Sequence, residues 1–219
     1  QSFSTLGSAM TGFALIVWSY RQQGSALSTA MLSVCTYAPY VLLSVFAGAL
    51  SDRWDRKRTM LVCDTLAALS TVVVMALLAT NRLQLWHLYG INAFNGLMNT
   101  VQQPAGDVAI TLLTPKEQYQ RTSGIRSLSN SLITMLTPAI ATALMAFAGI
   151  RAVLWFDLFT FSVAFVALRW FVPLPKNGHA EDAKPGVLKA GLEGICYLKR
   201  EPGILHLILF LSIINFTAS

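Results

Sequence analysis

The chain has 219 residues, of which 54% are hydrophobic and only 12% are charged, and its formal net charge is +6. Charged residues make up about a quarter of an ordinary soluble domain, so this composition excludes that class and indicates a protein that spans a membrane. The positive surplus then reflects loops that set membrane topology rather than a nucleic-acid partner.

Six apolar stretches follow one another along the chain, each close in length to the roughly 20 residues that cross the hydrocarbon core as a helix. We expect these spans at residues 3–20, 28–50, 59–80, 85–111, 123–148 and 150–171. Residues 173–201 contain proline, glycine and charges, and predict a cytoplasmic linker with a short surface helix. A seventh span begins at residue 202 and is cut off at residue 219, so we expect a fragment of a longer chain.

The predicted fold class is an all-α polytopic membrane protein in which residues 1–172 form a six-helix bundle. Its orientation follows from the basic residues, which gather on the cytoplasmic side of membrane proteins. The loops and helix ends that we place inside carry 13 Lys and Arg residues, against three outside, Arg21, Arg82 and Arg151. This difference predicts a cytoplasmic amino terminus.

The most distinctive stretch joins the second and third spans. Its seven residues, 52–58, carry six charges directly after 30 residues that carry none. Charges this dense stay hydrated at a membrane surface, and their positive sum favours the cytoplasmic side. An ordinary basic cytoplasmic loop is the alternative interpretation.

The spacing within this stretch resembles the signature G-x-L-x-D-R-x-G-R-K/R, which lies between the second and third helices of major facilitator superfamily transporters. The matching residues are Gly48, Leu50, Asp52, Arg53, Arg56 and Lys57. The chain departs from the signature at Asp55, where most members carry glycine. This departure, the neighbouring Trp54 and the basic triplet at 56–58 resemble the macrolide-efflux and enterobactin-exporter branch.

The resemblance implies the amino-terminal half of a twelve-helix secondary transporter that works by alternating access. It implies proton-coupled efflux of bulky amphipathic compounds, such as macrolide-like drugs or siderophores, across the inner membrane of a bacterium. The expected partners are a small-molecule substrate, protons, the lipid bilayer and the carboxyl-terminal half of the transporter, with no nucleic acid and no cofactor. We expect no enzyme activity because the sequence has no catalytic or metal motif. A membrane-embedded enzyme or lipid-handling protein on the same bundle is the alternative.

Two departures from the family concern coupling to protons. Many drug–proton antiporters carry an arginine in the fourth helix, and this chain has none between Arg82 and the end of that span. Their fifth helix carries the motif G-P-x-x-G-G, where this chain reads Thr137-Pro138-Ala139-Ile140-Ala141.

The fourth span carries amide side chains three or four residues apart, a spacing that places them on one face of a helix. Four amides facing lipid would be costly, so they are expected to face other helices or a water-filled cavity. Interhelical hydrogen bonding is the alternative to a binding cavity. In the family the first, second, fourth and fifth helices line the central cavity, so we expect these residues to bind substrate: Tyr37, Tyr40, Asn92, Asn95, Asn99, Gln102, Asn130 and Thr134.

Three acidic residues lie within spans or at their ends, and such acids are candidates for proton coupling. They are Asp64, Asp107 and Asp157, and the alternative is structural pairing, for Asp64 and Asp107 with Lys or Arg from the loops. In the family the loop acid and arginine latch the two halves on the cytoplasmic face, together with an acid low on the fourth helix. The corresponding gating residues here are Asp52, Arg53, Arg56 and Asp107. A further face of the first span carries Ser4, Ser8 and Thr11.

Overall fold

The computed structural model describes residues 2–51 and 55–171, together with isolated positions between 203 and 214. Its long helices are α1 (Ser2–Gln23), α2 (Ala26–Ser51), α3 (Arg56–Ala79), α4 (Leu85–Leu113) and α5 (Tyr119–Val166). A 3-10 turn, η1 (Lys116–Gln118), precedes α5, and a π-helical end, η2 (Ala167–Phe171), continues it. No strand occurs among the described residues, which confirms the all-α fold class.

Two glycines separate helices where the sequence predicts boundaries between spans. Gly149 divides α5 with a φ of 74° and a ψ of 179°, between the predicted spans 123–148 and 150–171. Gly24 turns the chain from α1 into α2 with a φ of 61°. Both angles lie in a region that glycine adopts readily and other residues avoid. The fifth and sixth predicted spans are thus two helical segments within α5.

Asp55, the residue that departs from the facilitator signature, begins α3. Its carboxylate accepts a hydrogen bond of 3.0 Å from the backbone N–H of Arg58. A side-chain cap of this kind stabilises a helix start by about 1 kcal/mol relative to alanine, and by about a few tenths of a kcal/mol relative to glycine, which has no side chain to provide the bond. The departure therefore has a structural reason at the start of the helix.

Three helices of the described residues are long and apolar enough to cross a membrane: Ala26–Ser44, Arg56–Ala79 and Lys116–Phe171. The last of them contains both the fifth and the sixth predicted spans. Helices α1 and α4 have the length of a span, but hydroxyl and amide side chains lower their hydropathy. Their crossing of the membrane stays a prediction.

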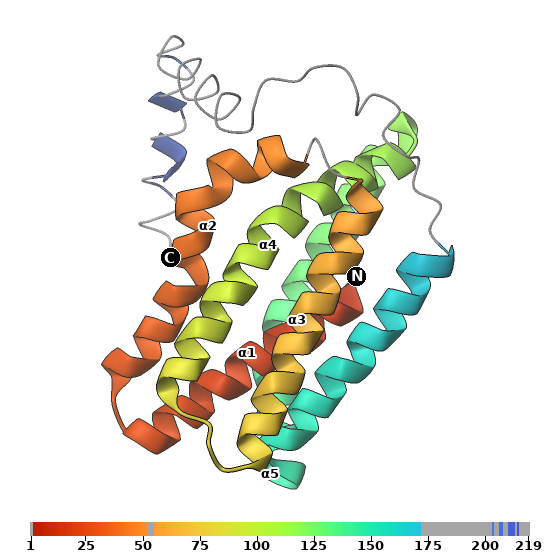
Figure 1. Cartoon of the computed structure of the whole chain (residues 1–219). Coiled ribbons are helices and arrows are strands. Elements are labelled where there is room, and N and C mark those ends of the chain that lie inside the picture. The colour runs from red at the N-terminus through yellow and green to blue at the C-terminus, as the bar shows by residue number, and fades with distance from the viewer. Residues whose placement is uncertain are drawn as a thin grey trace.

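The helices pack side by side, with α1 against α5, α2 against α4, and α3 against both α4 and α5 (Figure 1). One buried cluster joins all five long helices, with one residue from each: Leu15, Leu32, Val74, Leu88 and Leu154. A second cluster, of Met60, Ala105, Ala109 and Leu168, joins α3, α4 and η2. Many large apolar side chains lie outside these clusters, and Phe147 is 91% exposed. Such a surface suits a lipid environment.

Helices α2 and α4 are in close backbone contact at Gly96. A Cβ atom at this position would overlap the backbone oxygen of Thr36 on α2. Only glycine therefore fits here without a shift of one helix. This contact fixes the height at which the amide side chains of α4 meet α2.

The predicted linker, residues 173–201, lies outside the described residues. The described positions between 203 and 214 are helical, at the place of the predicted seventh span. The boundaries of the three predicted segments, 1–172, 173–201 and 202–219, stay predictions.

Candidate functional site

Two amides of α4 bond to residues on neighbouring helices. Asn92 Oδ1 accepts a hydrogen bond of 3.2 Å from the Thr36 hydroxyl on α2, while its Nδ2 donates to the Leu88 backbone oxygen at 2.8 Å. Asn95 Oδ1 accepts a hydrogen bond of 3.0 Å from the Ser70 hydroxyl on α3. Both amides thus contribute to helix packing, in agreement with the alternative of interhelical hydrogen bonding. Both side chains are only partly buried.

The third bonded amide, Gln102, contacts one of the three intramembrane acids. Its Nε2 donates a hydrogen bond of 2.5 Å to Asp64 Oδ1 on α3. Asp64 is 9% exposed, and none of the described Lys, Arg or His residues forms an ion pair with it. The structural alternative for Asp64, pairing with a Lys or Arg of the loops, finds no such partner among these residues, and a neutral amide contacts the carboxylate instead.

The remaining predicted substrate residues are exposed on the surface of the described bundle. Tyr37 and Tyr40 on α2 are 67% and 44% exposed. Asn99 on α4 is exposed, and so are Asn130 and Thr134 on α5, where the Thr134 hydroxyl donates to the Asn130 backbone oxygen. These five side chains come from α4, which carries the bonded amides, from α2, which packs against α4, and from α5, which packs against α1 and α3.

Asp107 near the end of α4 forms an ion pair with Arg126 on α5. Their side chains are 49% and 42% exposed, so the pair is open to solvent or to another part of the protein. This pairing with a basic residue agrees with the structural alternative for Asp107. It also joins α4 to α5 at the end of the bundle where α3 begins.

Asp157 on α5 is surrounded by hydroxyl groups from two other helices. Its carboxylate accepts hydrogen bonds from Ser8 and Thr11 on α1 at 3.2 and 3.1 Å, and from Thr71 on α3 at 2.9 Å. The sequence showed that Ser8 and Thr11 lie on one hydroxyl-bearing face of the first span. It did not show that this face contacts Asp157.

The charged loop is described from Asp55 onward, so Asp52 and Arg53 lie outside the described residues. Arg56 is half-buried, and its Nε is a buried donor without a hydrogen-bond partner among them. Lys57 Nζ donates a hydrogen bond of 3.2 Å to the backbone oxygen of Arg169 in η2. The start of α3 is thereby attached to the end of the sixth predicted span.

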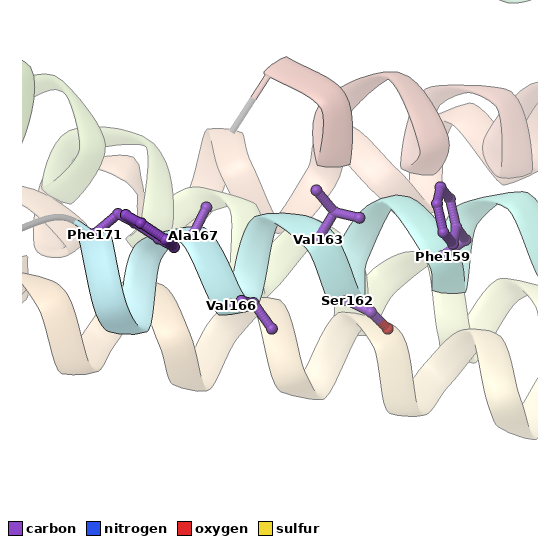
Figure 2. A pocket seen from close by; sticks show the side chains of 6 residues that line it. All are labelled: Phe159, Ser162, Val163, Val166, Ala167 and Phe171. Carbon is purple, nitrogen blue, oxygen red and sulfur yellow. The ribbon is translucent and has the colours of Figure 1, made fainter.

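Two hollows in the described surface contain none of the predicted substrate residues. A space of about 780 Å³ lies between the end of α1 and the α3–α4 turn, with Trp18, Trp86 and Tyr89 among its lining residues. A groove of about 400 Å³ follows α5 and η2, and Figure 2 shows its lining side chains along this one helix, from Phe159 to Phe171.

The family model of the Major Facilitator Superfamily matches residues 1–219, which is the whole chain. The chain belongs to the major facilitator superfamily. It is thus a multi-pass membrane protein, with a helical bundle of the facilitator type.

The chain is similar to several bacterial transporters over most of its length. Macrolide efflux protein A of Streptococcus pyogenes is 25% identical over 210 residues, which are 95% of this chain and 52% of that protein. Macrolide efflux protein A of Enterococcus faecalis is 25% identical over 187 residues, 85% of this chain and 57% of that protein. The MFS-type transporter YfiS of Bacillus subtilis (strain 168) is 24% identical over 220 residues, 99% of this chain and 51% of that protein. This facilitator chain spans about half the length of these relatives.

Proposed function

We propose that the full-length protein is a secondary transporter that exports bulky amphipathic small molecules by alternating access, coupled to protons. The family supports transport, and relatives named macrolide efflux protein A support a macrolide-like substrate class. The observation that carries the proposal is the polar stripe of α4, in which Gln102 contacts the buried acid Asp64. The family supports a transporter rather than the alternative of a membrane-embedded enzyme.

The substrate site would form where the α4 stripe meets the exposed residues of α2 and α5. Tyr37 and Tyr40 would supply aromatic contact area, and Asn99 would supply an amide whose exposure leaves it accessible to a ligand. Asn92 and Asn95 already bond to α2 and α3, so their role is to hold the stripe in place and to add polar contacts at its edge. Apolar area with a few fixed polar groups is typical of small-molecule sites. Asn130 and Thr134 would line the opposite side, on α5.

Asp64 is the acid that we place in proton coupling, because it contacts the stripe. An ionised carboxylate only accepts hydrogen bonds, whereas a protonated one also donates. A proton on Asp64 therefore changes the hydrogen bond that Gln102 can make. Gln102 lies on the same face of α4 as Asn99, so this change would alter the polar stripe that contains Asn99. Asp107 would act in gating through its partner Arg126, and Asp157 lies apart from the stripe in a shell of hydroxyl groups.

The cytoplasmic gate would involve Asp52, Arg53, Arg56 and Asp107. Arg56 supports this role because its buried Nε lacks a partner among the described residues, and an unpaired buried donor is costly. A carboxylate in the other half of the transporter would supply the partner when the cytoplasmic side closes. The 13 basic residues on the predicted inner side support a cytoplasmic amino terminus in a bacterial cell.

Transport by the full-length protein in liposomes tests this proposal. With the interior acidic, a radiolabelled macrolide added outside is expected to accumulate in vesicles whose transporters expose their cytoplasmic face, and a protonophore should stop the accumulation. Equal accumulation with and without the pH gradient would contradict proton coupling. Absence of macrolide movement, with another amphipathic compound accumulating, would restrict the error to the substrate class.

A further inference from the structure

The junction of α1, α3 and α5 gathers oxygen atoms around one buried carboxylate. Asp157 is 5% exposed; its Oδ1 lies 3.2 Å from Ser8 Oγ, and its Oδ2 lies 3.1 Å from Thr11 Oγ1 and 2.9 Å from Thr71 Oγ1. Five side-chain oxygens from three helices thus meet in one place. Thr11 and Thr71 are also buried, at 7% and 5% exposed, whereas Ser8 is exposed.

Close packing of α1 keeps this junction compact. A Cβ atom at Gly7 would lie 2.9 Å from Asp157 Oδ1 and would overlap Thr160 Oγ1. A sixth oxygen, Thr160 Oγ1, therefore lies near the same position, and its hydroxyl donates to the Asp157 backbone oxygen at 2.9 Å. Any residue with a Cβ atom at position 7 would displace α1 from the carboxylate.

The Asp157 carboxylate has no basic partner among the described residues. The ion pair found among them joins Asp107 to Arg126. An isolated buried charge is unfavourable and needs a compensating charge or a proton. A proton requires only one oxygen, whereas this site has oxygens from three helices. Each hydroxyl can rotate its hydrogen away and offer a lone pair, so the same shell can face a cation.

We propose that this cluster binds a hard monovalent cation of the size of sodium between the Asp157 carboxylate and the hydroxyls of Ser8, Thr11 and Thr71. Oxygen ligands without nitrogen or sulfur select hard cations over transition metals. One carboxylate balances one positive charge, which favours a monovalent ion over calcium or magnesium. The short spacing of the oxygens favours sodium or lithium over the larger potassium ion. The cation enters past Ser8, the exposed ligand.

The test measures the melting temperature of the purified full-length protein in detergent, at one pH and one ionic strength, in sodium, lithium, potassium or choline chloride. A ligand that binds only the folded state raises the melting temperature with a saturable dependence on concentration. Sodium is expected to raise it by about 2–4 °C over choline, with potassium close to choline. The stability readout makes this inference independent of the proposed export activity.

The variants Asp157→Asn and Thr71→Val are expected to remove the sodium shift. Thr100→Val is the matched control, because Thr100 is equally buried and its hydroxyl bonds to the backbone of its own helix. Thr100→Val should therefore keep the full shift. Thr11→Ser, which retains the hydroxyl, should also keep it.

Equal melting temperatures in sodium and choline would overturn the proposal, and so would a sodium shift that survives Thr71→Val. A melting temperature that changes with pH but not with sodium would assign the site to a proton alone. If the variants do not fold, binding of radioactive sodium to the wild-type protein decides the question. Displacement by lithium but not by choline is then expected, and absence of bound sodium overturns the proposal.

Discussion

Gln102 on α4 donates a hydrogen bond of 2.5 Å to the carboxylate of Asp64 on α3, so the polar stripe of α4 ends on a buried acid. The neighbouring Gln103 is exposed, although it differs from Gln102 by one position only. Gln102 and Gln103 therefore allow a direct comparison between an amide that bonds to an intramembrane acid and a neighbouring exposed amide.

We expect Asp64→Asn in the full-length transporter to abolish transport driven by a pH gradient while exchange of substrate between the two sides continues. The reason is that asparagine keeps the contact with Gln102 but cannot bind and release a proton. Gln102→Leu should weaken the coupling as well, and Gln103→Leu is the matched control that should leave it unchanged. Gradient-driven uptake by Asp64→Asn at the wild-type rate would exclude Asp64 as the coupling acid.

The roles of packing and binding in the α4 stripe separate at Asn95 and Asn99. Asn99→Ala should leave the melting temperature unchanged, because the side chain is exposed, and should weaken substrate binding by about 2- to 10-fold, the equivalent of one hydrogen bond. Asn95→Ala should weaken binding and, unlike Asn99→Ala, should also lower the melting temperature, because the Ser70 hydroxyl loses its partner. Binding titrations and thermal melts of both variants make the comparison. Full transport by the double variant would leave the stripe with a packing role alone.

Asp52→Asn and Arg56→Ala are expected to abolish transport, and Asp107→Asn to impair it, with substrate binding retained in all three. The loss follows if these charges hold the closed cytoplasmic gate, since the ligand site lies elsewhere. Asp107→Asn also breaks the ion pair with Arg126, and an exposed pair of this kind contributes little stability, so the protein should still fold. Normal transport by Asp52→Asn, with the loop still accessible from the cytoplasm, would contradict a gating role.

Gly96→Ala is expected to destabilise the protein by about 1–3 kcal/mol, because the added methyl group would overlap the Thr36 backbone oxygen and separate α2 from α4. Gly90→Ala is its control on the same helix, since nothing lies within 4 Å of a Cβ atom there. Alanine favours a helix over glycine, so Gly90→Ala should be neutral or stabilising. Chemical or thermal unfolding of the two variants measures the difference, and equal stabilities would show that the helices can separate at little cost.

Membrane topology can be read from single cysteines placed at Gln22, Lys57 and Lys176. A reagent that cannot cross the membrane, added from outside, should label position 22 and leave positions 57 and 176 unlabelled, because basic residues mark the cytoplasmic side. Labelling of permeabilised cells controls for reactivity at all three positions. Reaction at 57 or 176 but not at 22 would reverse the orientation.

The sequence by itself determined where the helices lie, because the length of an apolar stretch and its breaks are local properties. Gly24 and Gly149 interrupt the helices at the predicted boundaries, and polar residues come directly after the helix ends at Ala79 and Leu113. The match between the charged loop and the facilitator signature also depends on residues close in sequence, and the family model confirms the family that this match indicated. The loop residue that departs from the signature, Asp55, required the structure for its explanation as a helix cap.

Only the tertiary structure decided what the polar residues contact. Helical spacing gives the face on which Asn95 or Gln102 lies, but not which helix is opposite, because that depends on packing of the whole bundle. The partners of Asp157 are 146 and 86 positions away at Thr11 and Thr71, and no local pattern connects them. The same packing paired Asp64 with an amide, Asp107 with Arg126 and Asp157 with hydroxyls, so three acids that look alike in sequence acquired three different surroundings.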